Sequence, residues 1–423
     1  MLVSSNSIVI TSNEILETER NKNFITMYEY STFQAFRPHF DALARVGYFK
    51  VVLKPETKWQ KKLHDCYRAF VWMGVIGFNI QYMTRAIKVR HQTDQLIASM
   101  FLLLSPLNTL GKQLTYNFRV RRIDKIIETL NSPLFAPKNN DHETLVKVNV
   151  KYMSRLLAVC QIGAVTCCFL YSVSPFVEKL LGYEVALTAS FPFDVRKFTP
   201  FLIAHLYMGI LLCMQGYGHI TMDCIIVAFY ACVKNQLQLF RYDLEHLMDD
   251  FKLRKRNLKY VDDDDEYRKI LHDKIVACFK HYDKIYWLAR EVQSIFNEAM
   301  VMQFFVTTWV ICMTVYRIVE LPLFTPIFFF SLSYLFCILG QLFMYCYIGT
   351  HLKNESGLVN DSIYESDWLS MSPAFRRYLF ILMERCKREI EPRAAFIIPM
   401  SLDTYISVLR SSYALFTILN GTE

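Results

Sequence analysis

The chain has 423 residues, of which 53% are apolar and 15% aromatic, and it carries a formal net charge of +8. This composition is typical of a membrane protein with several spans and disfavours a soluble protein. Most of the twelve cysteines lie in apolar stretches, where reduced and packed thiols are expected. No phosphate-binding loop, serine-hydrolase motif or zinc-protease motif is present, so we expect neither an enzyme nor a bound metal or cofactor.

The polar residues 1–64 are predicted to form a cytoplasmic segment. Apolar residues repeat at helical spacing between 28 and 51, with Phe36, Phe40 and Leu43 among them. Two interpretations are open: this stretch lies along the inner membrane surface, or it packs against the inner ends of the spans. A second amphipathic stretch, near 123–130, ends before a Ser-Pro pair that breaks the helix.

Residues 65–420 are predicted to form one seven-helix unit. A membrane span needs about 20 mostly apolar residues. Seven stretches reach or approach this length, and they are 69–87, 94–114, 153–176, 200–233, 299–319, 321–349 and 400–419. The predicted fold class is therefore all-α, with seven transmembrane helices.

The basic residues are concentrated on alternate connections between these stretches. Of the 47 Lys and Arg, 37 lie in 1–64, 117–155, 234–298 and 350–393, and 7 lie in the other set of connections. Basic loops stay in the cytoplasm, so the N-terminus is predicted inside and the C-terminus outside. G-protein-coupled receptors have the opposite orientation. The positive charge then reflects topology rather than nucleic-acid binding.

The fourth and fifth helices are predicted to extend beyond the bilayer. The helical pattern from Pro200 to Arg241 covers about 40 residues, or about 60 Å. The fifth helix begins near Ile275, well before its span. We expect these extensions, about 234–298, to form a cytoplasmic anchor with residues 350–395. The acidic run between them, residues 262–266, is expected to be a solvated loop.

Charged residues inside spans are costly and tend to be functional. Asp223 is expected near the inner interface, where its cost is small. Asp403 belongs to a pattern typical of a helix N-terminus. Arg410 either lines water, which we favour, or pairs with another helix. His205 and His219 are expected to be core histidines, because no acidic partner is apparent at a suitable spacing.

The last helix interrupts its apolar residues with Ser and Thr. One interpretation is that a face of this helix lines a pore, which apolar side chains close by excluding water. The other is packing between helices through small hydroxyl residues. Leu415, Ile418 and Thr422 share a face at the outer end and are the predicted gate residues.

The C-terminal third resembles the insect odorant receptor family. The resemblance rests on Gln341-Leu342-Phe343-Met344-Tyr345-Cys346-Tyr347-Ile348-Gly349, Glu355-Ser356, Tyr364, Trp368 and the segments 400–405 and 411–416. Upstream, it is supported by Phe191-Pro192-Phe193-Asp194, Asp223, His281 and Gln303-Phe304.

This resemblance implies an odorant-gated, non-selective cation channel subunit in the plasma membrane of a sensory-neuron dendrite. Such subunits are surrounded by membrane lipid and assemble with a shared co-receptor as heterotetramers. The last helix lines the pore for permeant cations, the inner helix ends form the anchor, and a small volatile odorant binds in the outer half. The final helix contains the polar sequence Arg410-Ser411-Ser412, and in this it resembles that of an odorant-specific tuning subunit rather than the more apolar one of the co-receptor.

Three alternative functions are open. A metabotropic seven-span chemoreceptor is the first. A gustatory-type receptor channel is disfavoured, because Thr404-Tyr405 is not followed by the Gln-Phe of that related family. A transporter is also disfavoured, because the chain shows no repeated halves.

The predicted odorant pocket lies where the outer halves of helices two, three, four and six converge. Such pockets are mostly apolar and aromatic, with few polar groups. Core packing is the alternative role for each candidate. The candidates are Ile97, Met100, Phe101, Phe169, Tyr171, Tyr207, Leu211, Phe330, Ser333 and Tyr334, with Met100 and Tyr207 preferred.

Overall fold

The computed structural model describes residues 36–50, 57–180, 189–191, 197–249, 260 and 265–420. The fold is all-α apart from two short antiparallel strands, β1 (Arg393–Ala394) and β2 (Ile398–Pro399), in which Ala394 pairs with Ile398. Most of the acidic run, the N-terminal residues 1–35 and the motif residues 192–194 lie outside the described part of the chain.

Seven helices coincide with the seven predicted apolar stretches. They are α3 (Lys58–Lys88), α4 (Thr93–Phe118), α6 (Asn140–Leu180), α7 (Phe198–Glu245), α9 (Asp265–Glu320), α10 (Pro326–Gly357) and α13 (Leu402–Asn420). Four of these, α6, α7, α9 and α10, are long and apolar enough to cross a membrane by length and composition. The count of seven spans and the orientation of the termini remain predictions.

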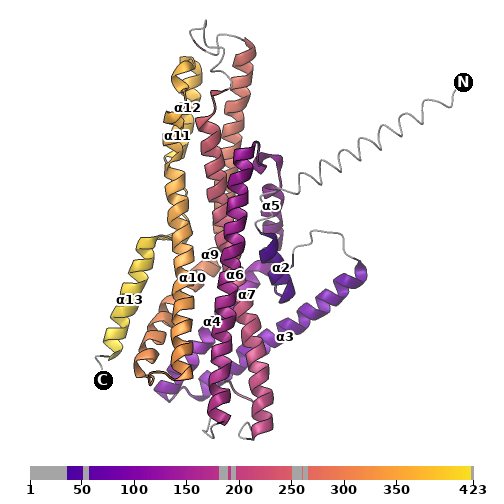
Figure 1. Cartoon of the computed structure of the whole chain (residues 1–423), viewed down its shortest axis with the longest axis vertical. Coiled ribbons are helices and arrows are strands. Elements are labelled where there is room, and N and C mark those ends of the chain that lie inside the picture. Colours follow the sequence, from indigo (N-terminus) through magenta and orange to yellow (C-terminus); the bar gives the residue numbers. More distant parts are fainter. Residues whose placement is uncertain are drawn as a thin grey trace, which may run out of the picture.

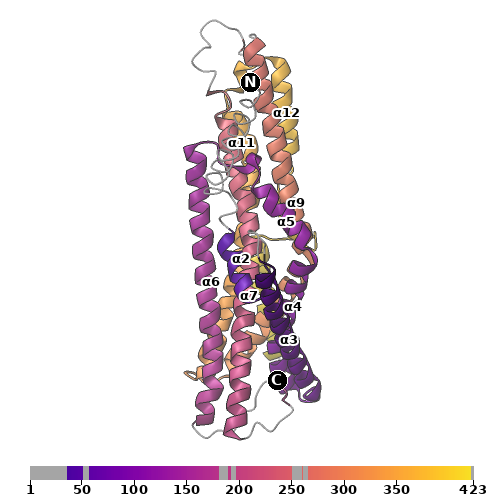
Figure 2. The ribbon, with the colours of Figure 1, turned by 90° about the vertical axis from the view of Figure 1, so that its right-hand side faces the viewer.

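The shorter elements lie mainly toward one end of this bundle. They are α2 (Arg37–Arg45), α5 (Val120–Leu130), η2 (Pro133–Phe135), α11 (Val359–Glu365), η5 (Trp368–Ser370) and α12 (Pro373–Cys386). Figure 1 shows α6, α7, α9 and α10 running along the long axis, with α11 and α12 at the upper end. In the same view α3 crosses obliquely and α13 lies along one side; the rotated view in Figure 2 shows the bundle edge-on.

The predicted lengths of the fourth and fifth helices are confirmed, whereas their projection into the cytoplasm stays a prediction. α7 contains 48 residues and α9 contains 56, far more than a bilayer requires. Asp265 and Glu266 form part of the first turn of α9, where acidic residues oppose the positive end of the helix dipole. The last two residues of the acidic run are thus helical.

The amphipathic segments pack against the bundle. Phe36, Phe40 and Leu43 are buried, and the ring of Phe36 lies 4.8 Å from that of Phe229 in α7. This favours packing over a position on the membrane surface for the described part of the segment. The apolar stripe of α5, residues 123–130, is also buried, and α5 ends at Leu130, before the Ser-Pro pair that was predicted to break the helix.

Local sequence explains where several helices begin. Thr57 and Gln60 form a reciprocal capping box at the start of α3. Thr325 caps α10, because its hydroxyl accepts from the backbone N–H of Phe328 at 3.3 Å. Ser401 accepts from the N–H of Thr404 at 3.2 Å, so Ser401 caps α13, as the pattern around Asp403 predicts.

Two glycines allow close backbone approaches. A Cβ atom on Gly349 of α10 would lie 1.9 Å from the carbonyl oxygen of Met400, just before α13 begins. A Cβ atom on Gly218 of α7 would lie 2.3 Å from the ring of Tyr48. Each contact therefore depends on the absence of a side chain.

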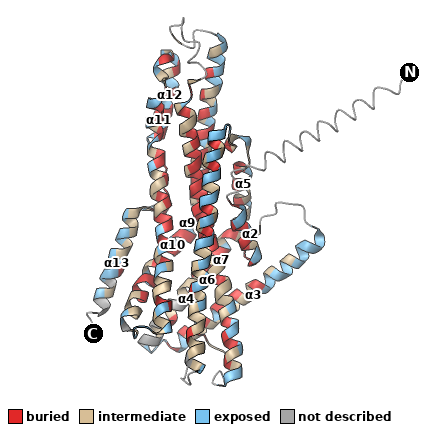
Figure 3. Ribbon diagram, in the orientation of Figure 1, coloured by how far each residue is buried: buried red, intermediate tan, exposed pale blue. Residues whose placement is uncertain are grey.

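Buried residues are concentrated along α7, α9 and α10, as the red ribbon in Figure 3 shows. By contrast, large apolar side chains on the outer faces are exposed, and they include Phe70, Ile162, Ile203, Phe305 and Phe336. An exposed apolar surface of this extent is typical of contact with lipid or another protein. Ion pairs join the segments that the sequence predicts to form the anchor: Arg241 contacts Glu355 at 2.5 Å, and Lys353 contacts Glu391 at 3.0 Å.

Candidate functional site

A cavity of about 140 Å³ lies between α4, α6, α7 and α10. Its wall is formed by Ser105, Pro106, Thr109, Ala164, Cys167, Cys168, Leu212, Gln215, Gly216, His219, Ile220, Phe330, Tyr334, Cys337, Ile338 and Gln341. A protein cavity of about 150 Å³ is large enough to hold benzene. This cavity therefore has the volume of a single-ring molecule, and its wall is mostly apolar with a few polar groups.

The aromatic part of the wall comes from α10. The rings of Phe330 and Tyr334 are stacked, with centroids 5.7 Å apart, and Tyr171 of α6 contacts Phe330 at 4.9 Å. The hydroxyl of Tyr334 is 2.6 Å from that of Ser105 in α4. This hydrogen bond fixes the ring against the opposite wall.

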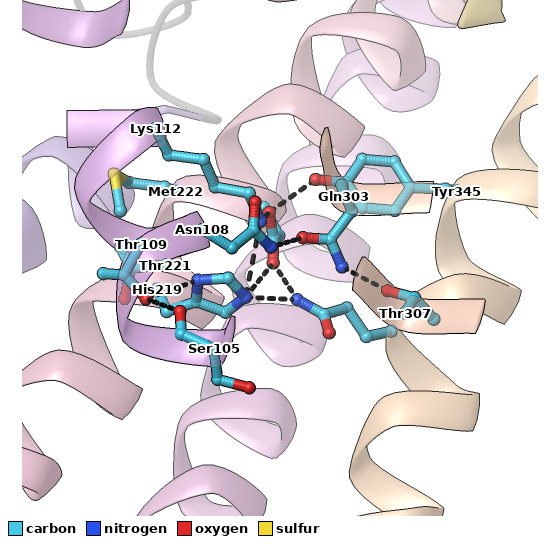
Figure 4. Close-up of polar contacts among 12 residues, drawn as sticks. Ser105, Asn108, Thr109, Lys112, His219, Thr221, Met222, Gln303, Thr307 and Tyr345 are labelled. Carbon is cyan, nitrogen blue, oxygen red and sulfur yellow. Dashed lines mark hydrogen bonds and ion pairs between the residues drawn. The ribbon is translucent and has the colours of Figure 1, made fainter. Parts of the chain in front are cut away.

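The polar part of the wall is centred on His219 (Figure 4). Thr109 donates its hydroxyl hydrogen to the carbonyl of Ser105 at 2.9 Å, so its oxygen accepts from Nδ1 of His219, also at 2.9 Å. The Nε2 atom of His219 then accepts from the amide of Gln341 at 2.9 Å. These partners select the histidine tautomer with its proton on Nδ1.

Next to His219 lies a fully buried ion pair between Lys112 of α4 and Asp223 of α7. Tyr345 donates its hydroxyl to Oδ1 of Asp223 at 2.6 Å, and the amide of Gln341 donates to Oδ2. A buried ion pair is tolerated only where such additional hydrogen bonds compensate its loss of water. The cluster ties α4, α7 and α10 together beside the cavity, to which His219 and Gln341 connect it.

A second buried network joins α4 to α9. Asn108 donates to Gln303 at 2.6 Å, and Gln303 donates to Thr307 at 2.9 Å (Figure 4). The resemblance had singled out Gln303. Its contact with α4 places α9 beside the same segment of α4 that carries Thr109 and Lys112.

Two premises that concern Asp223 are wrong: its expected small cost, and the absence of an acidic partner for His219. The side chain of Asp223 has no exposed surface, so its charge is fully removed from water. His219 does have an acidic neighbour, since Asp223 lies four residues later on the same helix face, with Oδ2 3.4 Å from Nε2. By contrast, His205 is a core histidine, buried with Nε2 2.7 Å from the carbonyl oxygen of Ser172.

Phe330 and Tyr334 are the only wall residues that were predicted from the sequence as pocket residues. Lys112, Gln215 and Gln341 are among the residues of the wall and the adjoining cluster that were missed, although Gln341 begins the segment that carries the resemblance. Lys112 is a lone lysine in an apolar stretch, a signal that could have identified it. Gln215 and Gln341 carry no such signal, because an uncharged amide within a span is compatible with ordinary packing. All twelve cysteines are free thiols, and three of them line the cavity.

The predicted pocket residues occupy different places. Phe330 and Tyr334 line the cavity, and Tyr171 packs behind them. Ser333 lines a separate hollow between α6 and α10. Leu211 and the other partly buried candidate, Met100, pack against the core without lining the cavity.

The remaining candidates lie toward the surface or outside the part of the chain that the structure describes. The ring centroids of Tyr207 and Phe191 are 6.4 Å apart, and Phe169 is 63% exposed. The side chains of Ile97, Phe101, Leu415 and Ile418 lie outside the described residues, as does all of Thr422. The predicted gate therefore stays a prediction.

The described part of α13 contacts the bundle along one side. The ring of Tyr405 lies 5.7 Å from Phe343 of α10, and the hydroxyl of Ser412 lies 3.5 Å from the carbonyl oxygen of Thr308 in α9. Arg410 is exposed. Much of the surface of α13 is thus available to water, lipid or another subunit.

Comparison with known proteins identifies the family. The model of the family described as 7tm Odorant receptor matches residues 92–413. Odorant receptor 23a of Drosophila melanogaster is 22% identical over 333 residues, which cover 76% of this chain and 81% of that protein. Odorant receptor Or1 of Anopheles gambiae is 17% identical over 387 residues, which cover 88% of this chain and 92% of that protein.

A solved structure extends the similarity to the fold. The insect olfactory receptor OR5 of Machilis hrabei, determined in complex with eugenol, superposes with a TM-score of 0.80 at 13% sequence identity. The superposition covers 95% of this chain and 100% of that chain. Its helical arrangement is therefore shared, and the chain belongs to the insect 7tm odorant receptor family.

Proposed function

We propose that this chain is an odorant-specific subunit of a ligand-gated, non-selective cation channel. The observation that carries the proposal is the cavity between α4, α6, α7 and α10, which is small, mostly apolar and adjoined on one side by the buried cluster around Asp223. A volatile of low polarity fits such a wall. The similar receptor with bound eugenol supports an odorant as the ligand.

In this proposal the molecule spans the plasma membrane seven times, with the N-terminus inside. The exposed apolar faces of α3, α6 and α7 support contact with lipid. The distribution of Lys and Arg supports the orientation. The cavity then lies in the outer half, and the ends of α7 and α9 near residues 234–298 form the cytoplasmic anchor with 350–395.

Four subunits, some of them the co-receptor, surround one pore in the proposed assembly. The pore is lined by α13, whose exposed side supports this role. Leu415, Ile418 and Thr422 form the gate near its outer end, where apolar side chains exclude water from a narrow column. The anchor makes most contacts between subunits.

Odorant binding is coupled to the pore through the polar wall. His219 and Gln341 line the cavity, and Gln341 also contacts Asp223. From there α10 continues to Gly349, which touches the turn before α13. A ligand in the cavity therefore contacts α10, the helix that touches the turn before α13.

The test is whole-cell recording from cells that express this chain with the co-receptor. Volatiles are applied with no GTP in the pipette, and the expected result is an inward cation current that persists under these conditions. A current that requires GTP would instead support a metabotropic receptor. Ile418→Ser, which places a small polar group at the gate, is expected to raise the resting current, and wild-type leak and permeability in that variant would exclude Ile418 from the gate.

A further inference from the structure

Gln215 of α7 is a buried glutamine that lines the cavity. Its side chain is 3% exposed, and neither its amide oxygen nor its amide nitrogen has a hydrogen-bond partner among the described residues. Buried polar groups are almost always hydrogen-bonded in folded proteins. A buried amide without a partner at a cavity wall therefore points to a molecule that supplies the partner.

The neighbouring polar groups on the wall are already engaged. Ser105 is bonded to Tyr334 at 2.6 Å, and Thr109 is bonded to His219 at 2.9 Å. The amide nitrogen of Gln341 contacts both His219 and Asp223. Gln215 thus differs from them in having both a donor and an acceptor available to a bound molecule.

We propose that the cavity selects a ring-sized volatile carrying one carbonyl or hydroxyl oxygen, and that Gln215 binds that oxygen. This inference rests on the function proposed above and specifies the class of odorant. The amide of Gln215 donates to a carbonyl and accepts from a hydroxyl. Phe330 and Tyr334 provide the apolar wall for the ring.

The cavity disfavours other classes of ligand. A hydrocarbon of the same size leaves the amide of Gln215 without a partner, and a site with a buried polar group rejects such analogues. A volume of about 140 Å³ excludes larger terpene-sized molecules without rearrangement of the wall. Charged ligands find no free counter-charge, because Lys112 and Asp223 neutralise one another.

The test uses matched pairs of probes on the purified full-length chain in lipid nanodiscs. Benzaldehyde and benzyl alcohol are compared with toluene, and cyclohexanone with methylcyclohexane, by the ligand-induced rise in unfolding temperature. We expect the oxygenated probes to bind at least about tenfold more tightly than their hydrocarbon partners, the factor that one hydrogen bond provides. This comparison is made first on the unmodified protein and needs no variant.

Gln215→Leu is expected to reduce the preference for oxygenated probes over hydrocarbons to less than about threefold. The substitution removes the hydrogen bond to the oxygen of the probe and keeps the volume of the side chain. Binding of toluene is expected to persist, which shows that the variant folds. Gln113→Leu is the matched control, since Gln113 of α4 is a buried glutamine outside the cavity wall. This control is expected to retain the preference of the unmodified protein.

Several outcomes overturn the inference. One is equal binding within each pair, and another is the absence of binding by every probe. A third is a preference that survives Gln215→Leu, which indicates that the amide is occupied by water rather than ligand. The same probes are then applied in whole-cell recording. Oxygenated probes that bind through Gln215 but gate no current leave this inference standing and contradict the channel function.

Discussion

Lys112 and Asp223 meet in the centre of the molecule without any exposed side-chain surface. Removing two charges from water costs several kcal/mol for each ion, and their attraction repays this only with good geometry and additional hydrogen bonds. Tyr345 and Gln341 supply those bonds from α10. We infer that the pair specifies how three helices are arranged rather than adding much to stability.

Replacing one member of this pair is expected to be more damaging than replacing both. Lys112→Met leaves the carboxylate of Asp223 buried and unpaired, at an expected cost of about 3–5 kcal/mol. Asp223→Leu leaves the ammonium of Lys112 in the same position. The double variant removes both charges and is expected to recover most of the lost stability.

The measurement is the unfolding temperature of the purified chain, with surface expression as a second readout. If the double variant is no more stable than the single variants, the cluster owes its effect to packing rather than charge.

Glu391, which lies outside the predicted spans, forms two salt bridges. Its carboxylate is 3.0 Å from Lys353 and 2.6 Å from Arg393. Burial raises the pKa of Glu391, but hydrogen bonds from Lys353 and Arg393 outweigh it, so its pKa is lower than usual. Its contribution to stability is therefore complete above the unfolded pKa of about 4.3 and is lost as pH falls through the lower folded pKa.

Glu391→Gln is accordingly expected to destabilise the chain by about 1 kcal/mol at neutral pH. The difference from the unmodified chain is expected to shrink as pH falls below about 4.3. Unfolding measured across pH for both proteins tests this. Glu389→Gln is the control, because Glu389 lies 3.7 Å from Lys353 and is half-exposed. A constant difference at every pH would show that ionisation of Glu391 is not involved.

At the scale of helices, the sequence predicted elements better than contacts between them. The lengths of α7 and α9 were predictable because their apolar periodicity continues beyond the spans. The cavity was only partly predictable: Phe330 and Tyr334 had been selected by depth, and they line it. Lys112 and Gln341 come from different helices, and periodicity within one helix identifies a face without identifying its neighbour.

Gly349 joins α10 to the turn before α13, and its substitution is expected to displace α13. In Gly349→Ala the new Cβ meets the carbonyl oxygen of Met400, which is backbone and cannot move aside as a flexible side chain does. We expect odorant-evoked current to fall several-fold while ligand binding at the cavity is retained, because the cavity residues of α10, 330–341, lie at least two turns before Gly349. Both are measured, as current and as ligand-induced thermal stabilisation.

Gly340→Ala is the matched control, since nothing lies within 4 Å of a Cβ at that position of the same helix. Normal current in Gly349→Ala, or an equal loss in Gly340→Ala, would contradict a specific role for the contact with Met400.

At the scale of the whole molecule, orientation follows from the 37 basic residues on one set of connections and the 7 on the other. An epitope tag added after Glu423 is expected to be stained on intact cells, and a tag before Met1 only after permeabilisation. Staining of the N-terminal tag on intact cells would reverse the topology and exclude the proposed pore.

The helices around the cavity differ in stiffness. α4 and α6 contain the interior prolines Pro106 and Pro175, whereas α7 has no proline beyond its first turn. A proline removes a backbone hydrogen bond and creates a joint, and Pro106 lies in the cavity wall itself. An uninterrupted helix of 48 residues is a rod about 72 Å long.

This difference in stiffness sets how far a local displacement would spread through the molecule. A tilt of about 3° about one end of a 72 Å rod moves its other end by about 4 Å. A ring-sized molecule pressing on the wall near Pro106 can flex α4 locally, while α7 carries any tilt undiminished to the opposite end of the molecule. The cavity residues of α7 lie between 212 and 220, about 20–33 Å from the start of this helix, so a tilt about that start displaces the opposite end about two to three times as far as the cavity wall.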